Sequence, residues 1–217
     1  MISKRLIIAL DTDDLNLVKK LSVFFDPKLC LMKVGLQLYI AHGKEVLDYL
    51  SEQGFEIFLD LKLHDIPNTV AKAIKEIQKF NIKMTTIHSQ GGVEMINAAL
   101  DQSNDIKILA VSLLTSLDKQ DVSRLYDNDF EKQFEMLLKV ITDTKTHGIV
   151  CSPHELVKIS DNNLIKVVPG IRNVDVSDDQ KRIMSSKAAY ANGADFIVVG
   201  RPIINSENPS EEYKKYL

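Results

Sequence analysis

Residues 60–69 read Asp60-Leu61-Lys62-Leu63-His64-Asp65-Ile66-Pro67-Asn68-Thr69. An apolar run at 55–59 precedes this segment, and apolar residues at helical spacing follow it at 70–80. A short apolar run predicts a buried strand, whereas helical spacing predicts an amphipathic helix. The segment is therefore expected to join the end of a strand to the start of a helix.

Three charged residues stand at this junction. Side chains alternate along a strand, so Asp60 and Lys62 are expected to share one face, with Asp65 beyond the strand in the turn. Leu61 and Leu63 take the opposite face. Such charges cost free energy unless they face a polar cleft. One interpretation is an ion-pair cluster on the surface. The interpretation that we favour is a site in which two carboxylates hold Lys62 protonated and aimed.

The same alternation of apolar runs and helical patterns extends along the chain. Eight strands are predicted, at 6–10, 31–34, 55–59, 84–88, 106–112, 148–151, 165–168 and 196–199. Helices are predicted at 15–25, 42–53, 70–80, 93–100, 130–147, 153–159, 180–192 and 209–217, with an irregular polar segment at 118–129. Strict alternation implies parallel strands with right-handed crossovers. Eight units favour a single-domain (β/α)₈ TIM barrel over residues 1–217, because closure removes both sheet edges; a doubly wound open sheet is the alternative.

The composition is that of an ordinary globular protein. The chain has 217 residues, of which 45% are hydrophobic and 26% charged, and its formal net charge is −3. This charge gives no general attraction to nucleic acid or to anionic membranes. Two cysteines, Cys30 and Cys151, make neither a disulfide framework nor a metal motif, so both are expected to be buried and reduced. The apolar run at 6–10 is too short for a signal or transmembrane segment, and we expect a cytoplasmic protein.

Polar residues recur where the predicted strands end, which is where a closed barrel forms its site. They are Asp11, Lys33, Asp60, Lys62, His88, Thr115, Arg172 and Arg201. A helix cap is the simpler interpretation of Asp11, and a satisfied structural role is the simpler one for His88. A lysine inside a buried strand, such as Lys33, is costly unless it is paired.

Two arginines follow consecutive predicted strands. Arg172 ends the motif Pro169-Gly170-Ile171-Arg172, and Arg201 follows Gly200 after the last strand. Each motif is weak by itself, but the ends of the seventh and eighth strands bind phosphate in many barrels. We therefore expect a ligand that carries a phosphate group.

Taken together, these motifs resemble those of the bacterial type of orotidine 5′-phosphate decarboxylase. The resemblance covers nearly the whole chain. It runs in order through Leu10-Asp11, Lys33-Val34-Gly35, residues 60–70, His88-Ser89-Gln90-Gly91-Gly92, Leu114-Thr115-Ser116, Pro169-Gly170-Ile171-Arg172, Asp179-Gln180 and Val199-Gly200-Arg201-Pro202. The segment at 60–69 in combination with Lys33 is its most specific part. The resemblance implies conversion of orotidine 5′-phosphate to UMP and CO₂, the last step of UMP synthesis, without metal or other cofactor.

The resemblance also implies catalytic roles. Lys62 would protonate C6 of the pyrimidine after CO₂ leaves, within an alternating array of charges that includes Lys33, Asp60 and Asp65. Asp65 would reach into the site of a neighbouring subunit, so that a homodimer shares its active sites. An ammonium group flanked by carboxylates can stabilise a C6 carbanion and then protonate it. Phosphate contacts far from C6 can supply the binding energy that closes the site.

Substrate-binding roles follow from the same resemblance. Asp11 and Lys33 would bind the ribose hydroxyls, Asp60 would lie at the substrate carboxylate, and Thr115 would lie near the pyrimidine. The partner subunit would contribute Ile66 and Thr69. The phosphate would be bound by Gln180, Arg201 and the Gly200 backbone, and Arg172 falls at a ligand-binding position before the following loop. That loop departs from the family pattern, because it looks slightly short and lacks a glycine often found there. The departure affects the closure of the loop and not the chemistry.

Two other functions are weighed against this one. The 3-keto-L-gulonate 6-phosphate decarboxylases and hexulose-phosphate synthases resemble the chain in their Asp-x-Lys-x-x-Asp element and use Mg²⁺. They carry an acid where this chain has Lys33, and a cation at that position opposes a metal site. A barrel that binds a nucleotide as a sensor is the third possibility, but it would have little need for Lys62 between two acids.

Overall fold

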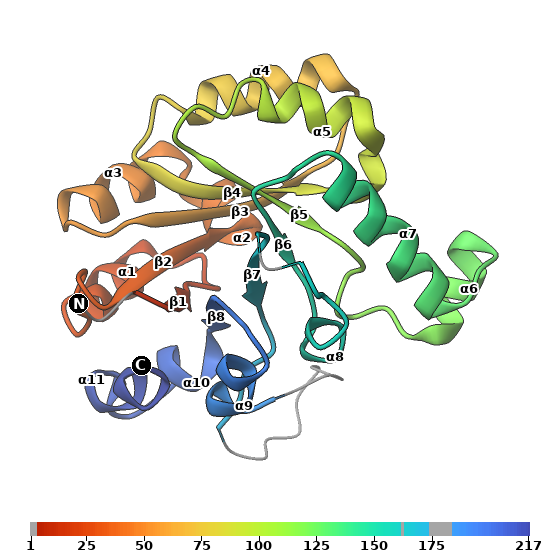
Figure 1. The fold of residues 1–217 in the computed structure, drawn as a ribbon. Helices are drawn as coiled ribbons and strands as arrows, with labels where there is room; N and C mark the ends of the chain where they lie inside the picture. Colours follow the sequence, from red (N-terminus) through yellow and green to blue (C-terminus); the bar gives the residue numbers. More distant parts are fainter. Residues whose placement is uncertain (1–3, 162, 174–183) are drawn as a thin grey trace.

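The computed structural model describes residues 4–161, 163–173 and 184–217. Its parallel strands form a closed barrel in sequence order, and β8 pairs with β1 (Figure 1). The strands are β1 Leu6–Ala9, β2 Cys30–Gly35, β3 Ile57–Leu63, β4 Ile82–His88, β5 Lys107–Val111, β6 Gly148–Val150, β7 Ile165–Val168 and β8 Phe196–Val199. The expected (β/α)₈ barrel is confirmed, and the open sheet was the wrong alternative.

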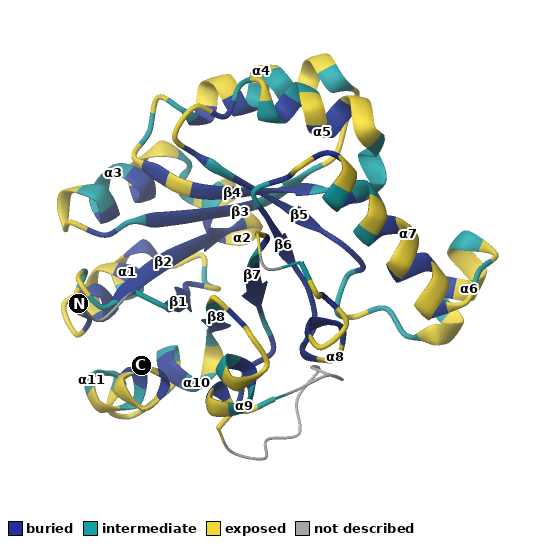
Figure 2. Cartoon of the chain, in the orientation of Figure 1, coloured by how far each residue is buried: buried dark blue, intermediate teal, exposed yellow. Residues whose placement is uncertain are grey.

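Helices surround the barrel and cover the outer faces of its strands (Figure 1). They are α1 Leu15–Ser22, α2 Leu36–His42, α3 Lys44–Glu52, α4 Pro67–Ile77, α5 Gly92–Leu100, α6 Lys119–Tyr126, α7 Phe130–Asp143, α8 Pro153–Leu156, α9 Ser186–Ala191, α10 Arg201–Ile204 and α11 Pro209–Glu212, with 3₁₀ turns η1 Ser89–Gly91 and η2 Tyr213–Tyr216. In Figure 2 the strands are largely buried, while the helices turn exposed faces to solvent. None of the helices in the described ranges is long and apolar enough to cross a bilayer.

Two apolar layers explain why the strands read as continuous apolar runs. One fills the barrel interior and includes Ile7, Leu31, Phe58, Met84, Leu109 and Val167. The other lies between strands and helices and includes Ile8, Met32, Leu59, Ile87, Ile108 and Val168. Alternate residues of one strand thus enter different layers, and both faces are buried. Cys30 and Cys151 are buried and form no disulfide, as expected.

Three helices were not predicted. The segment at 118–129 contains α6, whose start is fixed by a capping box between Asp118 and Asp121, so the expectation of an irregular segment was wrong. Helix α2 precedes α3, and Gly43 separates them with a φ of 50°. Helix α10 directly follows β8. These helices were not predicted because α2 and α6 each bury only one residue and α10 is only four residues long. None of the three therefore has a strong apolar periodicity.

Several helices have other bounds in the structure than the sequence predicted. The helices expected at 15–25, 130–147 and 153–159 end earlier, at Ser22, Asp143 and Leu156. The helix expected at 180–192 covers Ser186–Ala191 within the described ranges. Helix ends fray, and turn residues can continue an apolar pattern after the helix has ended.

Strand β3 contains a bulge where the polar segment begins. It advances four residues from Leu59 to Leu63, while β4 advances two from Thr85 to Ile87. Within this bulge Lys62 has a φ of 50°, a left-handed conformation that is uncommon for residues with a side chain. The strand therefore ends at Leu63, four residues later than expected, and the bulge contributes to the direction of the charged side chains.

Candidate active site

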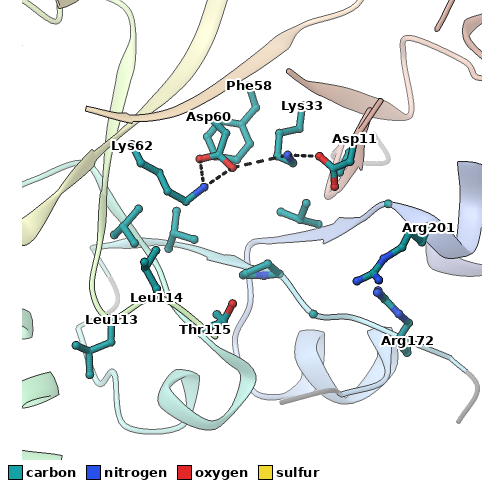
Figure 3. A pocket seen from close by; sticks show the side chains of 17 residues that line it. Asp11, Lys33, Phe58, Asp60, Lys62, Leu113, Leu114, Thr115, Arg172 and Arg201 are labelled. Carbon is teal, nitrogen blue, oxygen red and sulfur yellow. Dashed lines mark hydrogen bonds and ion pairs between the residues drawn. The ribbon is translucent and has the colours of Figure 1, made fainter. Parts of the chain in front are cut away.

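A cavity lies at the carboxyl end of the barrel (Figure 3). Its polar lining includes Asp11, Lys33, Asp60, Lys62, Thr115, Arg172, Gly200 and Arg201, and its apolar lining includes Phe58, Val111, Leu113, Leu114, Val150 and Val198. These polar residues come from six strands or the segments that follow them. The cavity therefore brings together all the polar strand-end residues that the sequence predicted except His88, which does not line it, although these positions are far apart in the chain.

Four charged side chains form a continuous array on one wall of the cavity (Figure 3). The ammonium of Lys62 donates to both oxygens of Asp60, at 2.8 and 2.9 Å. The ammonium of Lys33 donates to Asp11 Oδ1 at 2.9 Å and lies 3.8 Å from Asp60 Oδ2. Asp60 is thus shared between two lysines, which accounts for a lysine inside the buried strand β2.

The array keeps Asp60 ionised despite its burial. Burial raises the pKa of this carboxyl group, but the charges of Lys33 and Lys62 and the hydrogen bonds that it accepts outweigh burial, so the pKa lies below its ordinary value. Asp60 is only 9% exposed. A buried carboxylate that stays charged in this way can hold an ammonium group in a fixed place and can repel a second anion.

Two arginines reach a different part of the cavity from Lys62 (Figure 3). Arg201 begins α10, and Arg172 is buried after β7, where its Nη1 donates to the Ile171 carbonyl at 2.9 Å. Gly200 lies beside them; a Cβ there would come within 3.3 Å of both Ala9 Cβ and Asp11 Oδ2. A side chain at this position would crowd the ends of β1 and β8, which approach each other closely here. The paired guanidinium groups suit a phosphate.

Sequence comparison identifies the protein family of the chain that forms this cavity. The family described as "Orotidine 5'-phosphate decarboxylase / HUMPS family" matches residues 4–216. The chain belongs to this family.

Curated relatives within the orotidine 5′-phosphate decarboxylase / HUMPS family match the chain over most of its length. A protein of Ehrlichia canis named orotidine 5′-phosphate decarboxylase is 42% identical, with 94% of this chain and 92% of the relative covered. One of the same name from Ehrlichia chaffeensis is 38% identical, with 100% and 97% covered. The crystal structure of orotidine 5′-phosphate decarboxylase from Lactobacillus acidophilus matches with a TM-score of 0.85 and 35% identity, over 98% of this chain and 99% of the other.

Three predicted residues of this family member lie outside the cavity. Asp65, Ile66 and Thr69 are exposed, and Ile66 has 65% of its surface accessible. The carboxylate of Asp65 accepts the backbone N–H of Ile66 at 2.7 Å. None of the three is part of the cavity lining of its own chain. A fourth predicted residue, Gln180, lies outside the described residues.

His88 is not the satisfied structural histidine that the sequence suggested. Its Nδ1 is buried and has no hydrogen-bond partner among the described residues, and its ring lies 5.4 Å from that of His64. Burial lowers the pKa of His88, and the neighbouring His64 and Lys62 lower it further. This lowered pKa favours the neutral form of the imidazole beside the charged array.

Sequence reasoning missed Thr86. Its hydroxyl is fully buried and donates to Asp60 Oδ1 at 2.9 Å. Leu113, which lines the cavity, was not singled out either, and Leu114 was named only as part of the motif Leu114-Thr115-Ser116. The signal for Thr86 was present, because two adjacent polar residues, Thr85 and Thr86, stand between the buried apolar residues Met84 and Ile87 of the strand.

Proposed function

We propose that this chain converts orotidine 5′-phosphate to UMP and CO₂, the last step of UMP synthesis, without metal or other cofactor. One observation carries the proposal: the ammonium of Lys62 is bound by Asp60 in a cavity that also contains Arg201. Membership of the family and the names of the relatives support the same activity.

Phosphate recognition supplies the binding energy. Arg201, the backbone of Gly200 and Gln180 hold the phosphate, and Arg172 adds a second guanidinium group at the same part of the cavity. Asp11 and Lys33, already paired at 2.9 Å, bind the ribose hydroxyls. Binding energy from these groups, which do not react, can be used to hold the pyrimidine against Lys62.

The chemical step uses the charged array. The bond between C6 and the carboxylate carbon breaks, CO₂ leaves, and the electron pair stays on C6. The ammonium of Lys62 stabilises this carbanion and transfers a proton to it, so that hydrogen replaces the carboxylate. Neutral Lys62 then takes a proton from water. Asp60 repels the substrate carboxylate but not neutral CO₂, which favours bond breaking, and Thr115 lies near the pyrimidine.

A homodimer completes the site in this proposal. Asp65, Ile66 and Thr69 are exposed and reach the cavity of a second subunit. Large apolar side chains support an interface there, since Leu36, Ile40, Ile66 and Val93 are 53%, 79%, 65% and 47% exposed and follow the adjacent strands β2, β3 and β4. We also propose that the enzyme acts in the cytoplasm, with no nucleic-acid or membrane partner.

Magnesium-dependent chemistry on a keto sugar phosphate is the alternative within the same family. The position of Lys33 favours decarboxylation of the nucleotide, because its ammonium contacts Asp11 and approaches Asp60. A divalent cation bound by these two carboxylates would meet this positive charge. Among the described residues, no group of three His, Cys, Asp or Glu side chains is placed to hold a metal.

A spectrophotometric assay tests the proposal. Orotidine 5′-phosphate is added with and without EDTA, and loss of the orotate absorbance is followed. Turnover that is indifferent to EDTA is the expected result. Metal-dependent turnover of keto sugar phosphates would instead support the alternative chemistry, and tight binding of UMP with no turnover would indicate a nucleotide sensor.

A further inference from the structure

Thr86 connects the backbone of Lys62 to the side chain of Asp60. Its Oγ1 donates to Asp60 Oδ1 at 2.9 Å and accepts the backbone N–H of Lys62 at 2.8 Å. These directions are fixed, because an ionised carboxylate can only accept and a backbone N–H can only donate. Since Lys62 Nζ also donates to Asp60 Oδ1, the three residues form a closed ring of hydrogen bonds.

In the bulge of β3, the Thr86 hydroxyl accepts a backbone hydrogen bond that the regular ladder does not. In the β3–β4 register, the paired residues on either side of Lys62 are Leu59 and Leu63, and Lys62 has no partner of its own there. Its N–H is bound by the Thr86 hydroxyl instead of by a carbonyl of the ladder. The left-handed conformation of Lys62, with φ at 50°, is strained and persists only where its surroundings hold it.

Thr86 acts through these neighbours and not on a ligand. It is fully buried and is not part of the cavity lining. Met84, two residues earlier in β4, belongs to the barrel interior, and alternation places Thr86 on the same side. Thr86 therefore lies beneath the charged array.

We propose that Thr86 is a positioning residue for the decarboxylation: it anchors the left-handed backbone of Lys62 and fixes the carboxylate that binds the Lys62 ammonium. The inference rests on the proposed function of the cavity. Residues that support a reacting group affect catalysis strongly because small displacements of that group are costly.

A pH profile separates this role from simple packing. The charged and titratable groups around Asp60 are Lys33 on β2, Lys62 on β3 and His88 on β4, with Asp11 acting through Lys33. Burial raises the pKa of Asp60, and the Thr86 hydrogen bond is one of the contacts that lower it. Removal of the hydroxyl should raise this pKa, so kcat should begin to fall at a higher pH on the acid side.

The test compares three variants at Thr86 with one at Thr85. Thr86→Val keeps the shape of the side chain and removes the hydroxyl, and Thr86→Ser keeps the hydroxyl. Thr86→Ala removes the hydroxyl without placing a methyl group against the Asp60 carboxylate. Thr85→Val is the matched control, because Thr85 is equally buried and donates to the Leu59 carbonyl at 2.8 Å, away from the charged side chains. The readouts are kcat for orotidine 5′-phosphate, its pH profile, the Kd of UMP and the Tm.

Thr86→Val should lower kcat about 10- to 100-fold while the Kd of UMP changes less than about threefold. Thr86→Ser and Thr85→Val should keep kcat within about threefold of the wild type. If Thr86→Val does not fold, the contrast between Thr86→Ser and Thr86→Ala decides. Wild-type kcat and an unchanged pH profile in the variants without the hydroxyl would overturn the inference, as would an equal loss in Thr85→Val. An inactive wild-type protein would overturn the proposed function and this inference together.

Discussion

Both carboxylate oxygens of Asp60 accept hydrogen bonds from the ammonium of Lys62, at 2.8 and 2.9 Å. Lys33 approaches the same carboxylate and also pairs with Asp11, so the four side chains balance two positive and two negative charges. In the proposed dimer, Asp65 of a second subunit adds one negative charge and the substrate carboxylate another. Loss of CO₂ removes that last charge from a crowded site, which gives the array a direct part in the reaction.

Lys62→Ala should abolish decarboxylation, because no other group is proposed to protonate C6. UMP should still bind within about tenfold, a change of ~1.4 kcal/mol, since the phosphate is held by other residues. Calorimetry gives the Kd, and the orotate absorbance gives the rate. Lys75→Ala, which alters an exposed lysine on α4, is the control and should leave both unchanged. Substantial turnover by Lys62→Ala would remove Lys62 from the role of proton donor.

Arg201→Ala should weaken UMP binding by about 2–4 kcal/mol, because it removes one partner of a charge-assisted contact. Binding of uridine, which lacks the phosphate, should barely change. Titration of both ligands against wild type and variant gives the comparison. An equal loss for UMP and uridine would place Arg201 away from the phosphate.

Two inactive variants should complement one another if the site is shared. Homodimers of Lys62→Ala and of Asp65→Asn should each be nearly inactive, because each lacks a group at every site. When the two are unfolded and refolded together in equal amounts, about half of the dimers should be mixed. One site of each mixed dimer carries both substitutions and the other carries neither, so about a quarter of the wild-type activity should return.

Each variant refolded by itself is the control for this experiment and should stay inactive. Native mass spectrometry must show that mixed dimers have formed. If mixed dimers form and no activity returns, the site lies within one subunit and the proposal of a shared site fails.

Asp60→Asn should change how stability depends on pH. The pKa of Asp60 is lower in the folded protein than its ordinary value of 3.8. A group of this kind contributes stability above its unfolded pKa, and that contribution is lost as the pH falls through the folded pKa. The wild type should therefore lose stability relative to Asp60→Asn as the pH falls below 3.8.

Chemical denaturation between about pH 2.5 and 7 measures this difference in the free energy of unfolding. Asp105→Asn alters an exposed carboxylate and is the control. A difference between wild type and Asp60→Asn that stays constant over the whole range would contradict the lowered pKa of Asp60.

The barrel could be predicted from the sequence because its strands are buried on both faces. Runs such as 165–168 and 196–199 have the same bounds in the structure as in the sequence pattern. Gathering of polar residues at one end followed from the topology, since parallel strands bring their carboxyl ends together. Helices α2 and α6 bury one residue each and α10 has only four residues, so their apolar pattern was too weak to predict them.

The detail of the site could not be predicted in the same way. The bulge in β3 depends on pairing with β4, and its left-handed residue is a lysine and not the glycine that would have marked it. The contact between Thr86 and Asp60 spans 26 residues of sequence. Asp65, Ile66 and Thr69 are proposed to act in a second subunit, so their roles stay predictions, and so does the role of Gln180.

The bulge sets a requirement for anyone who wishes to transplant this chemistry to a designed scaffold. An idealised barrel of uniform strands offers only regular backbone positions, and a lysine and an aspartate grafted two residues apart onto such a strand would not reproduce the left-handed geometry of Lys62. The designer would have to insert the two extra residues of β3 and supply a hydroxyl from the adjacent strand. The smallest portable unit is thus a pair of neighbouring strands and not a list of catalytic side chains.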